Sequence, residues 1–376
     1  MQLSGEDSLK LNVLLHNDIQ AIRIHESSMT LYALSASGEE AKVPLSPNCP
    51  SERYLKYVRE MLSGHVLGSP GGYPVFLKRW TRMGQAKDES LADLLMLGEP
   101  EAVVAVANAP GLTDELARRA WWADPIAENA RRMLTSAQVV QGNMGKILAE
   151  FLVEHLAFET EPQVQIDTVR LVLQPGLIDE TTRKKLWASG ARKNTLRIGF
   201  LQANADNLPE LQPGRHDIEQ YSATLVQLAA NNPLAALLHR TLDSRGQGFL
   251  KASEEILKKP ANQDVVVALL NTVGDFFAEA RLSAHPPREI ESLVATGVVL
   301  CNERRSPLVC EILDQLPSLQ PELAALMSLA HVTDELVTPI FAKTTAEGTL
   351  MRRKLEPITQ PLLDLYSQLR QVGQRA

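Results

Sequence analysis

The sequence predicts a mainly α-helical protein, with a small N-terminal α+β module followed by an α-solenoid-like array of helical hairpins. Three observations support this fold class. A Pro-Gly motif occurs twice and each time follows an apolar helical stretch, short alternating runs of polar and apolar residues occur only near the N-terminus, and prolines interrupt the rest of the chain at short intervals. Aromatic residues make up only 5% of the chain, and abundant leucine and alanine favour helices over sheets.

The N-terminal module is predicted to contain a three-stranded antiparallel meander. Residues 20–25 and 30–34 alternate polar and apolar side chains, and residues 41–45 follow a Gly-containing turn. Residues 52–62 then show the spacing of an amphipathic helix. Because three strands are only marginally stable alone, we expect the sheet to pack against that helix or against the repeats that follow.

The repeated motif consists of Pro-Gly, an acidic pair, a basic pair and a tryptophan at fixed offsets. The copies are Pro110, Gly111, Asp114, Glu115, Arg118, Arg119 and Trp122, and Pro175, Gly176, Asp179, Glu180, Arg183, Lys184 and Trp187. Proline and a left-handed glycine end the preceding helix, and Thr113 and Asp179 are the predicted N-caps of the next one. Such self-similarity is typical of stacked hairpins. We therefore expect residues 100–122 and 162–187 to superpose, with both tryptophans mostly buried.

No strand is predicted after residue 90, where prolines restart the helices every one to two dozen residues. The polar stretch 202–216 contains two prolines and a glycine and is the candidate boundary between two helical lobes. The last predicted helix covers residues 361–370. The predicted domains are an α+β module at 1–90, a helical repeat lobe at 91–205 and a second helical lobe at 206–376.

Composition limits the classes of function. The 376 residues carry a net charge of −7, which argues against a dedicated nucleic-acid binder. The three cysteines, Cys49, Cys301 and Cys310, cannot all pair, which indicates a reducing compartment. The sequence shows neither a signal peptide at its start nor an apolar run of membrane-spanning length, so we expect a cytoplasmic protein.

A Gly-rich segment at residues 63–73 precedes a short basic and aromatic cluster. Nucleotide binding is not predicted, because the glycines are followed by Tyr73 and Pro74 where a P-loop needs lysine and a hydroxyl. A Gly-rich loop next to cations and aromatics could still bind a partner. The plainer interpretations are that the loop is a structural connector, and that the basic residues form a solvated face with Trp80 in the core. The candidate binding residues are Gly71, Gly72, Tyr73, Lys78, Arg79, Trp80 and Arg82. We expect Tyr73→Ala and Arg82→Ala to weaken partner capture while leaving thermal stability nearly unchanged.

No metal, cofactor or catalytic site is predicted. Glu150, Glu154, His155 and Glu159 come closest to a metal cluster, but the two pairs they form lie on different faces of one predicted helix. The sequence contains no Cys-x-x-Cys pair, nucleophile elbow or dinucleotide fingerprint. We therefore expect the purified protein to carry no stoichiometric metal or chromophore.

Several strings resemble those of a known family. Residues 64–74 read Gly-His-Val-Leu-Gly-Ser-Pro-Gly-Gly-Tyr-Pro, and residues 78–84 read Lys-Arg-Trp-Thr-Arg-Met-Gly. Together with residues 110–122 and 173–180, they resemble the sulfur reduction protein DsrS family, which is encoded with the dissimilatory sulfite reductase genes of sulfur-oxidising bacteria. The likeness is clear from residue 1 to about residue 200. The resemblance implies a soluble, cytoplasmic accessory or regulatory protein of sulfur oxidation, and it carries over no catalytic residue.

The expected function is therefore that of a non-catalytic accessory protein that binds other proteins, including components of the sulfur-oxidation machinery. We do not expect it to bind a membrane. Two alternatives remain open. A regulator that binds RNA or another polyanion would use Lys78, Arg79 and Arg82 together with the basic pairs of the two motif copies. A sulfur-relay protein would use Cys301 or Cys310, which requires a lowered thiol pKa.

Overall fold

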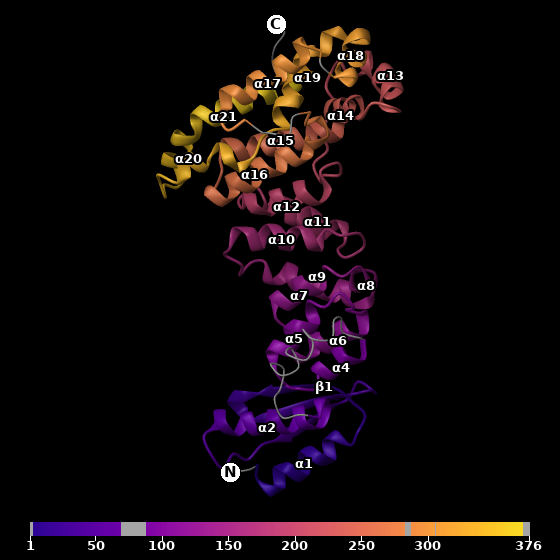
Figure 1. The fold of residues 1–376 in the computed structure, drawn as a ribbon, viewed down its shortest axis with the longest axis vertical. Coiled ribbons are helices and arrows are strands. Elements are labelled where there is room, and N and C mark those ends of the chain that lie inside the picture. The colour runs from indigo at the N-terminus through magenta and orange to yellow at the C-terminus, as the bar shows by residue number, and fades with distance from the viewer. Residues whose placement is uncertain (1–2, 69–87, 283–286, 305, 371–376) are drawn as a thin grey trace. The chain divides into compact units, whose positions relative to one another are not determined.

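A computed structural model describes residues 3–68, 88–282, 287–304 and 306–370 (Figure 1). Within these residues the protein is mainly helical and has one small antiparallel sheet near its N-terminus, as the sequence predicts. The chain forms two compact units, Met1–Ala157 with Gln174–Ile178, and Phe158–Leu173 with Asp179–Ala376. The predicted boundary near residue 205 falls within the second unit.

The sheet of the first unit has the order β1-β2-β3, and each neighbouring pair is antiparallel. Helices precede and follow it, and the first of them is absent from the sequence prediction. The elements are α1 (Gly5–Leu15), β1 (Ile19–His25), the 3-10 turn η1 (Glu26–Ser28), β2 (Thr30–Ser35), β3 (Glu40–Pro44) and α2 (Ser51–Leu67). The three predicted strands are thus confirmed to within a few residues.

Helices pack against β1 and β2 of this sheet, whereas β3 is largely exposed. On one face, Ile22 and Leu31 pack with Leu11 of α1 and Tyr54 of α2 in a buried apolar cluster. On the other face, β1 contacts α6 (Asp114–Ala123). The carbonyl of Leu95 also accepts a hydrogen bond of 2.9 Å from the Ile22 N–H at the free edge of β1. The sheet is therefore stabilised by both the helix and the repeat, as its marginal size requires.

The remaining described helices of the first unit are short, and among them only α6 has a side-chain N-cap, from Thr113. They are α4 (Asp88–Leu94), α5 (Pro100–Ala107), α6, α7 (Ala127–Met133), α8 (Ala137–Gln141) and α9 (Asn143–His155). Asp114 lies in the first turn of α6, and its carboxylate accepts 3.0 Å hydrogen bonds from the N–H groups of Asn143 and Met144, which begin α9. A side chain at Gly142 would collide with this carboxylate. One motif residue therefore also fixes the start of a later helix.

In its described residues, the second unit consists of helices and 3-10 turns. Its elements are α10 (Pro162–Val172), α11 (Glu180–Ser189), α12 (Asn194–Asn204), α13 (Ile218–Ala229), α14 (Pro233–Leu242), α15 (Ser244–Lys258), α16 (Gln263–Phe276), η2 (Ala278–Ala280), α17 (Ile290–Asn302), α18 (Pro307–Gln315), η3 (Pro317–Leu319), α19 (Gln320–Leu329), η4 (Asp334–Leu336), α20 (Thr338–Phe341) and α21 (Gly348–Arg370). Proline is the first residue of α10, α14 and α18, where its missing N–H costs nothing.

Residues 205–217, which include most of the predicted boundary segment, are held in place by ion pairs. Asp206 pairs with Arg240 and Glu210 pairs with Lys251, each at 2.6 Å. Arg215 is fully buried and binds the Glu322 carboxylate of α19 at 2.7 Å. This segment therefore packs as part of the second unit although its composition is typical of a loose linker.

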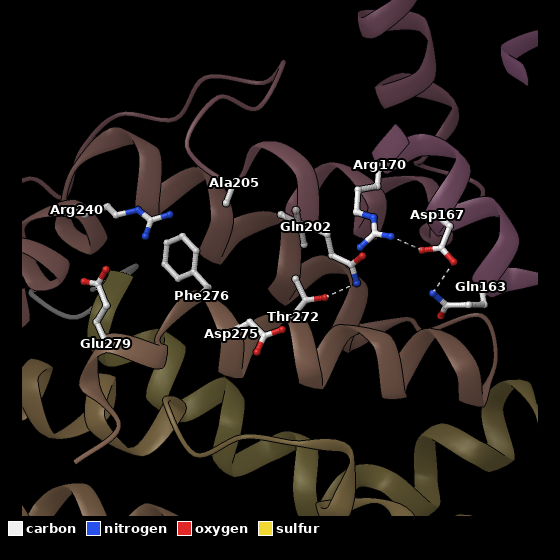
Figure 2. A pocket seen from close by; sticks show the side chains of 11 residues that line it. Gln163, Asp167, Arg170, Gln202, Ala205, Arg240, Thr272, Asp275, Phe276 and Glu279 are labelled. Carbon is white, nitrogen blue, oxygen red and sulfur yellow. Dashed lines mark hydrogen bonds and ion pairs between the residues drawn. The ribbon is translucent and has the colours of Figure 1, made fainter. Parts of the chain in front are cut away.

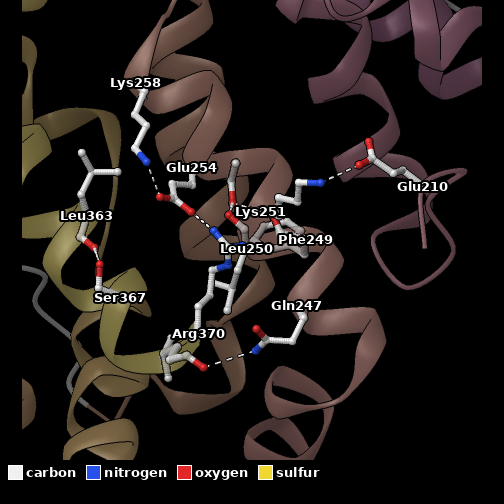
Figure 3. A network of polar contacts seen from close by, with 12 residues as sticks. Glu210, Gln247, Phe249, Leu250, Lys251, Glu254, Lys258, Leu363, Ser367 and Arg370 are labelled. Carbon is white, nitrogen blue, oxygen red and sulfur yellow. Dashed lines mark hydrogen bonds and ion pairs between the residues drawn. The ribbon is translucent and has the colours of Figure 1, made fainter. Parts of the chain in front are cut away.

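A polar network joins α15 to α21 (Figure 3). Glu254 accepts from Lys258 at 2.5 Å and also pairs with Arg370. The Gln247 amide donates to the Leu369 carbonyl at 3.3 Å. These contacts hold the last turn of α21, a helix that begins well before the predicted start at Pro361 and contains Pro357 and Pro361 in its interior.

Candidate functional site

The binding residues predicted from the sequence, Gly71, Gly72, Tyr73, Lys78, Arg79, Trp80 and Arg82, lie in the segment 69–87. This segment is outside the described residues. The predicted binding role of these side chains, and the effects expected of Tyr73→Ala and Arg82→Ala, therefore stay predictions.

Both copies of the repeated motif form a turn between two helices, α5 and α6 in the first copy and α10 and α11 in the second. The predicted N-caps are confirmed, because the Thr113 hydroxyl accepts from the Leu116 N–H at 3.2 Å and the Asp179 carboxylate accepts from the Thr182 N–H at 2.7 Å. Gly176 has the predicted left-handed conformation, with φ of +80°. Gly111 is not among the described glycines with a positive φ, so the two turns differ in conformation.

The two motif tryptophans differ in burial. Trp187 is 7% exposed and packs edge-on against Phe200 at 5.3 Å, as predicted. Trp122 is less deeply buried and is partly exposed to solvent. Its indole lies at the side of the sheet, where Arg23 covers one ring face and Glu40 accepts its N–H, and both of these partners are partly exposed to solvent.

The basic pairs of the motif are largely engaged within the chain. Arg118 and Arg119 both bind Glu115, at 2.7 and 2.9 Å, and these bonds lower the pKa of that carboxyl to about 2. Arg183 pairs with Glu180 at 3.2 Å, the same offset as Arg118 from Glu115. These arginines stabilise the first turns of their helices, and each has part of its hydrogen-bonding capacity already used.

The remaining predicted candidates do not gather into a site. Among the described residues, no three His, Cys, Asp or Glu side chains form a group that could hold a metal ion. His155 instead stacks on Phe151 at 5.5 Å. All three cysteines are free thiols, and burial raises the pKa of Cys301 to about 11. The Cys310 thiol donates to the Arg304 carbonyl at 3.2 Å.

The second unit contains a polar groove of about 520 Å³ that sequence reasoning missed (Figure 2). Its walls come from α10, α12, α14 and α16, and η2 closes one end. Gly199 brings two of these walls together, because a Cβ at this position of α12 would lie 2.6 Å from Val169 of α10. The close approach of α10 and α12 places Asp167 and Arg170 beside Gln202 along the groove.

Charged and amide side chains line the groove. At one end, Arg170 pairs with Asp167 at 3.2 Å, and the same carboxylate accepts from Gln163 at 3.2 Å. In the middle, the Gln202 amide donates to the Thr272 hydroxyl at 3.1 Å. The lining therefore offers hydrogen bonds and charge, and Thr272 donates its own proton to the Ala268 carbonyl.

Arg240 and Phe276 form the other end of the groove (Figure 2). The Arg240 guanidinium binds Asp206 at 2.6 Å and lies over the Phe276 ring, with Cζ 4.3 Å from the ring centroid. Phe276 is itself stacked on Phe249 at 3.8 Å. The ion pair with Asp206 and the contact with the Phe276 ring both restrict the rotamers of Arg240, so its guanidinium is held in place.

Comparison of the chain with protein-family models, with curated proteins and with solved structures finds no match. No helix in the described part of the chain is long and apolar enough to cross a membrane. The groove residues come from five separate elements and share no motif, so only the packing of these elements identifies them as neighbours.

Proposed function

We propose that this chain is a non-catalytic accessory protein that binds a segment of another protein in the groove of the second unit. The observation that carries the proposal is the groove itself, with side-chain amides and a hydroxyl along its middle and charged groups at both ends (Figure 2). Its volume of about 520 Å³ falls within the range of roughly 300 to 1,000 Å³ that is typical of ligand sites.

An extended polypeptide suits such a lining. Its backbone N–H and C=O groups lose water on binding and need new partners, which Gln163 and Gln202 can supply. Its side chains then meet the charged groups at the two ends of the groove. Stacked helical hairpins commonly present surfaces of this kind. The resemblance to the DsrS family supports a partner in cytoplasmic sulfur oxidation.

The two alternative functions have less support. A polyanion would have to compete with Glu115 for Arg118 and Arg119. A sulfur relay through Cys301 would need a thiolate, which its buried position disfavours.

The proposal can be tested by site-specific photo-crosslinking in sulfur-oxidising cells. A photoreactive amino acid is placed at Ala205, which lines the groove, or at Ala295, an exposed alanine of α17 in the same unit. We expect one protein to crosslink from Ala205 and not from Ala295, and we expect Gln202→Ala to weaken that crosslink. Equal crosslinking from both positions, crosslinking to nucleic acid, or none from Ala205 would contradict the proposal.

A further inference from the structure

The positively charged side chains of the groove have ion-pair partners, whereas two of its carboxylates do not. Both of its arginines already have carboxylate partners, since Arg170 binds Asp167 and Arg240 binds Asp206. Asp275 and Glu279 are exposed, and neither has an ion-pair partner among the described residues. The unpaired charge that a bound segment would meet in the groove is therefore negative.

The local backbone adds to this negative charge. Asp275 lies in the last turn of α16, a helix of 14 residues that ends at Phe276, and Glu279 follows in η2. The carbonyl end of a helix carries a partial negative charge, which favours cations near the last turn. Figure 2 shows both carboxylates on the α16 and η2 side of the groove, with Phe276 between them.

We propose that the groove selects a partner segment that carries at least two lysine or arginine side chains. This inference rests on the binding function proposed above and specifies the chemistry of the partner. Each cation of the segment pairs with one of the free carboxylates, Asp275 or Glu279, while the groove amides bind the backbone. An acidic segment is repelled by the same carboxylates, and the paired Arg170 and Arg240 offer it little compensating charge.

Fluorescence anisotropy with two labelled peptides tests the inference on the full chain. The probes are (Gly-Ser-Lys)₃ and (Gly-Ser-Glu)₃, which differ only in the sign of their charges. We expect the lysine peptide to bind, with an affinity that falls as salt is raised, and the glutamate peptide not to bind. The double variant Asp275→Asn/Glu279→Gln should weaken binding about tenfold, because it removes two exposed ion pairs.

A charge-matched variant separates groove binding from general attraction. Glu291→Gln/Glu347→Gln removes the same net charge from two exposed positions of the second unit outside the groove. We expect this control to change the affinity less than twofold. The inference is wrong if neither peptide binds, if both bind equally, or if the control loses as much affinity as the groove variant.

The two proposals fail in distinguishable ways. Crosslinking from Ala205 without selectivity for the lysine peptide would retain the proposed function and reject the basic partner. Selective binding of the lysine peptide without any crosslink from Ala205 would retain the charge preference of the groove and reject the proposed cellular function.

Discussion

The indole N–H of Trp122 donates a 3.1 Å hydrogen bond to the carboxylate of Glu40, a residue 82 positions away in the sequence. Arg23 completes the contact, because its guanidinium pairs with Glu40 at 2.8 Å and lies 4.6 Å from the Trp122 ring centroid. The three side chains join α6 to the outer strands of the sheet. The first copy of the repeated motif is thereby anchored to the N-terminal module.

The second copy has a comparable arrangement made from other elements. Arg197 of α12 lies over the Trp187 ring, with Cζ 5.1 Å from the ring centroid. The pKa of Glu210 is lowered mainly by its bond with Lys251, and hydrogen bonding to Trp187 contributes further. In each copy, the motif tryptophan thus meets an arginine and a glutamate that the motif itself does not contain.

Replacement of Trp122 by phenylalanine tests how strongly α6 is anchored to the sheet. Trp122→Phe keeps an aromatic ring but removes the N–H that Glu40 accepts, so we expect the free energy of unfolding of the first unit to fall by about 1 kcal/mol. Glu40→Gln retains an acceptor for the indole and removes only the exposed ion pair with Arg23, so it should cost less. Thermal and urea unfolding monitored by circular dichroism would measure both. Equal losses, or a larger loss for Glu40→Gln, would contradict the prediction.

Close approach of α17 and α19 gives a second prediction. A Cβ at Gly297 would overlap the carbonyl oxygen of Ala324, so Gly297→Ala should force these helices apart and destabilise the protein by about 1 to 3 kcal/mol. Gly248 of α15 is a matched control, because the nearest atom to a Cβ there is 3.8 Å away. We expect Gly248→Ala to be neutral or to stabilise the helix by up to about 1 kcal/mol. Similar melting temperatures for the two variants would contradict this account.

Local patterns in the sequence were sufficient to predict much of the fold. The three strands follow from alternation with a period of two, and the caps at Thr113 and Asp179 follow from residue type alone. The helix α1 was missed because its buried side includes Asp7, a carboxylate that accepts from the Tyr54 hydroxyl and from the Ser46 N–H. A buried acid interrupts the apolar pattern by which such helices are recognised.

The groove could not be predicted in the same way. Its charged residues belong to different helices, as Asp167, Arg240 and Asp275 show. In the sequence, each of them has the pattern of an ordinary solvated residue. Their proximity depends on close helix contacts such as that of Gly199 with Val169, which a single sequence does not reveal. The predicted start of α21 was wrong for a different reason. Proline usually begins a helix, whereas Pro357 and Pro361 lie inside this one.

The buried histidine His331 predicts a loss of stability in acid. Its side chain is 0% exposed, and neither ring nitrogen has a hydrogen-bond partner within the described residues. Burial, and secondly the charge of Arg281, lower its pKa below the ordinary value of 6.5. As the pH falls through 6.5, the unfolded chain therefore binds a proton that the folded chain does not, and stability decreases until the lower folded pKa is reached.

Urea unfolding at pH 7.5 and at pH 5.5 measures this effect. We expect His331→Leu to show a smaller decrease in unfolding free energy between the two pH values than the parent chain. His216 is an exposed histidine, and His216→Gln should leave the decrease unchanged. A decrease of the same size in all three proteins would show that His331 does not contribute to the acid sensitivity.

The buried thiol of Cys301 should be the least reactive of the three. It lies 1% exposed beside the Met327 sulfur, and a pKa of about 11 leaves roughly one thiol in a thousand ionised at pH 8. Cys49 and Cys310 are partly exposed. We therefore expect iodoacetamide to modify Cys49 and Cys310 of the folded protein well before Cys301, and all three at similar rates in urea, as followed by peptide mass spectrometry. Rapid alkylation of native Cys301, or a persulfide on it after incubation with a sulfur donor, would contradict this prediction and favour a sulfur-relay role.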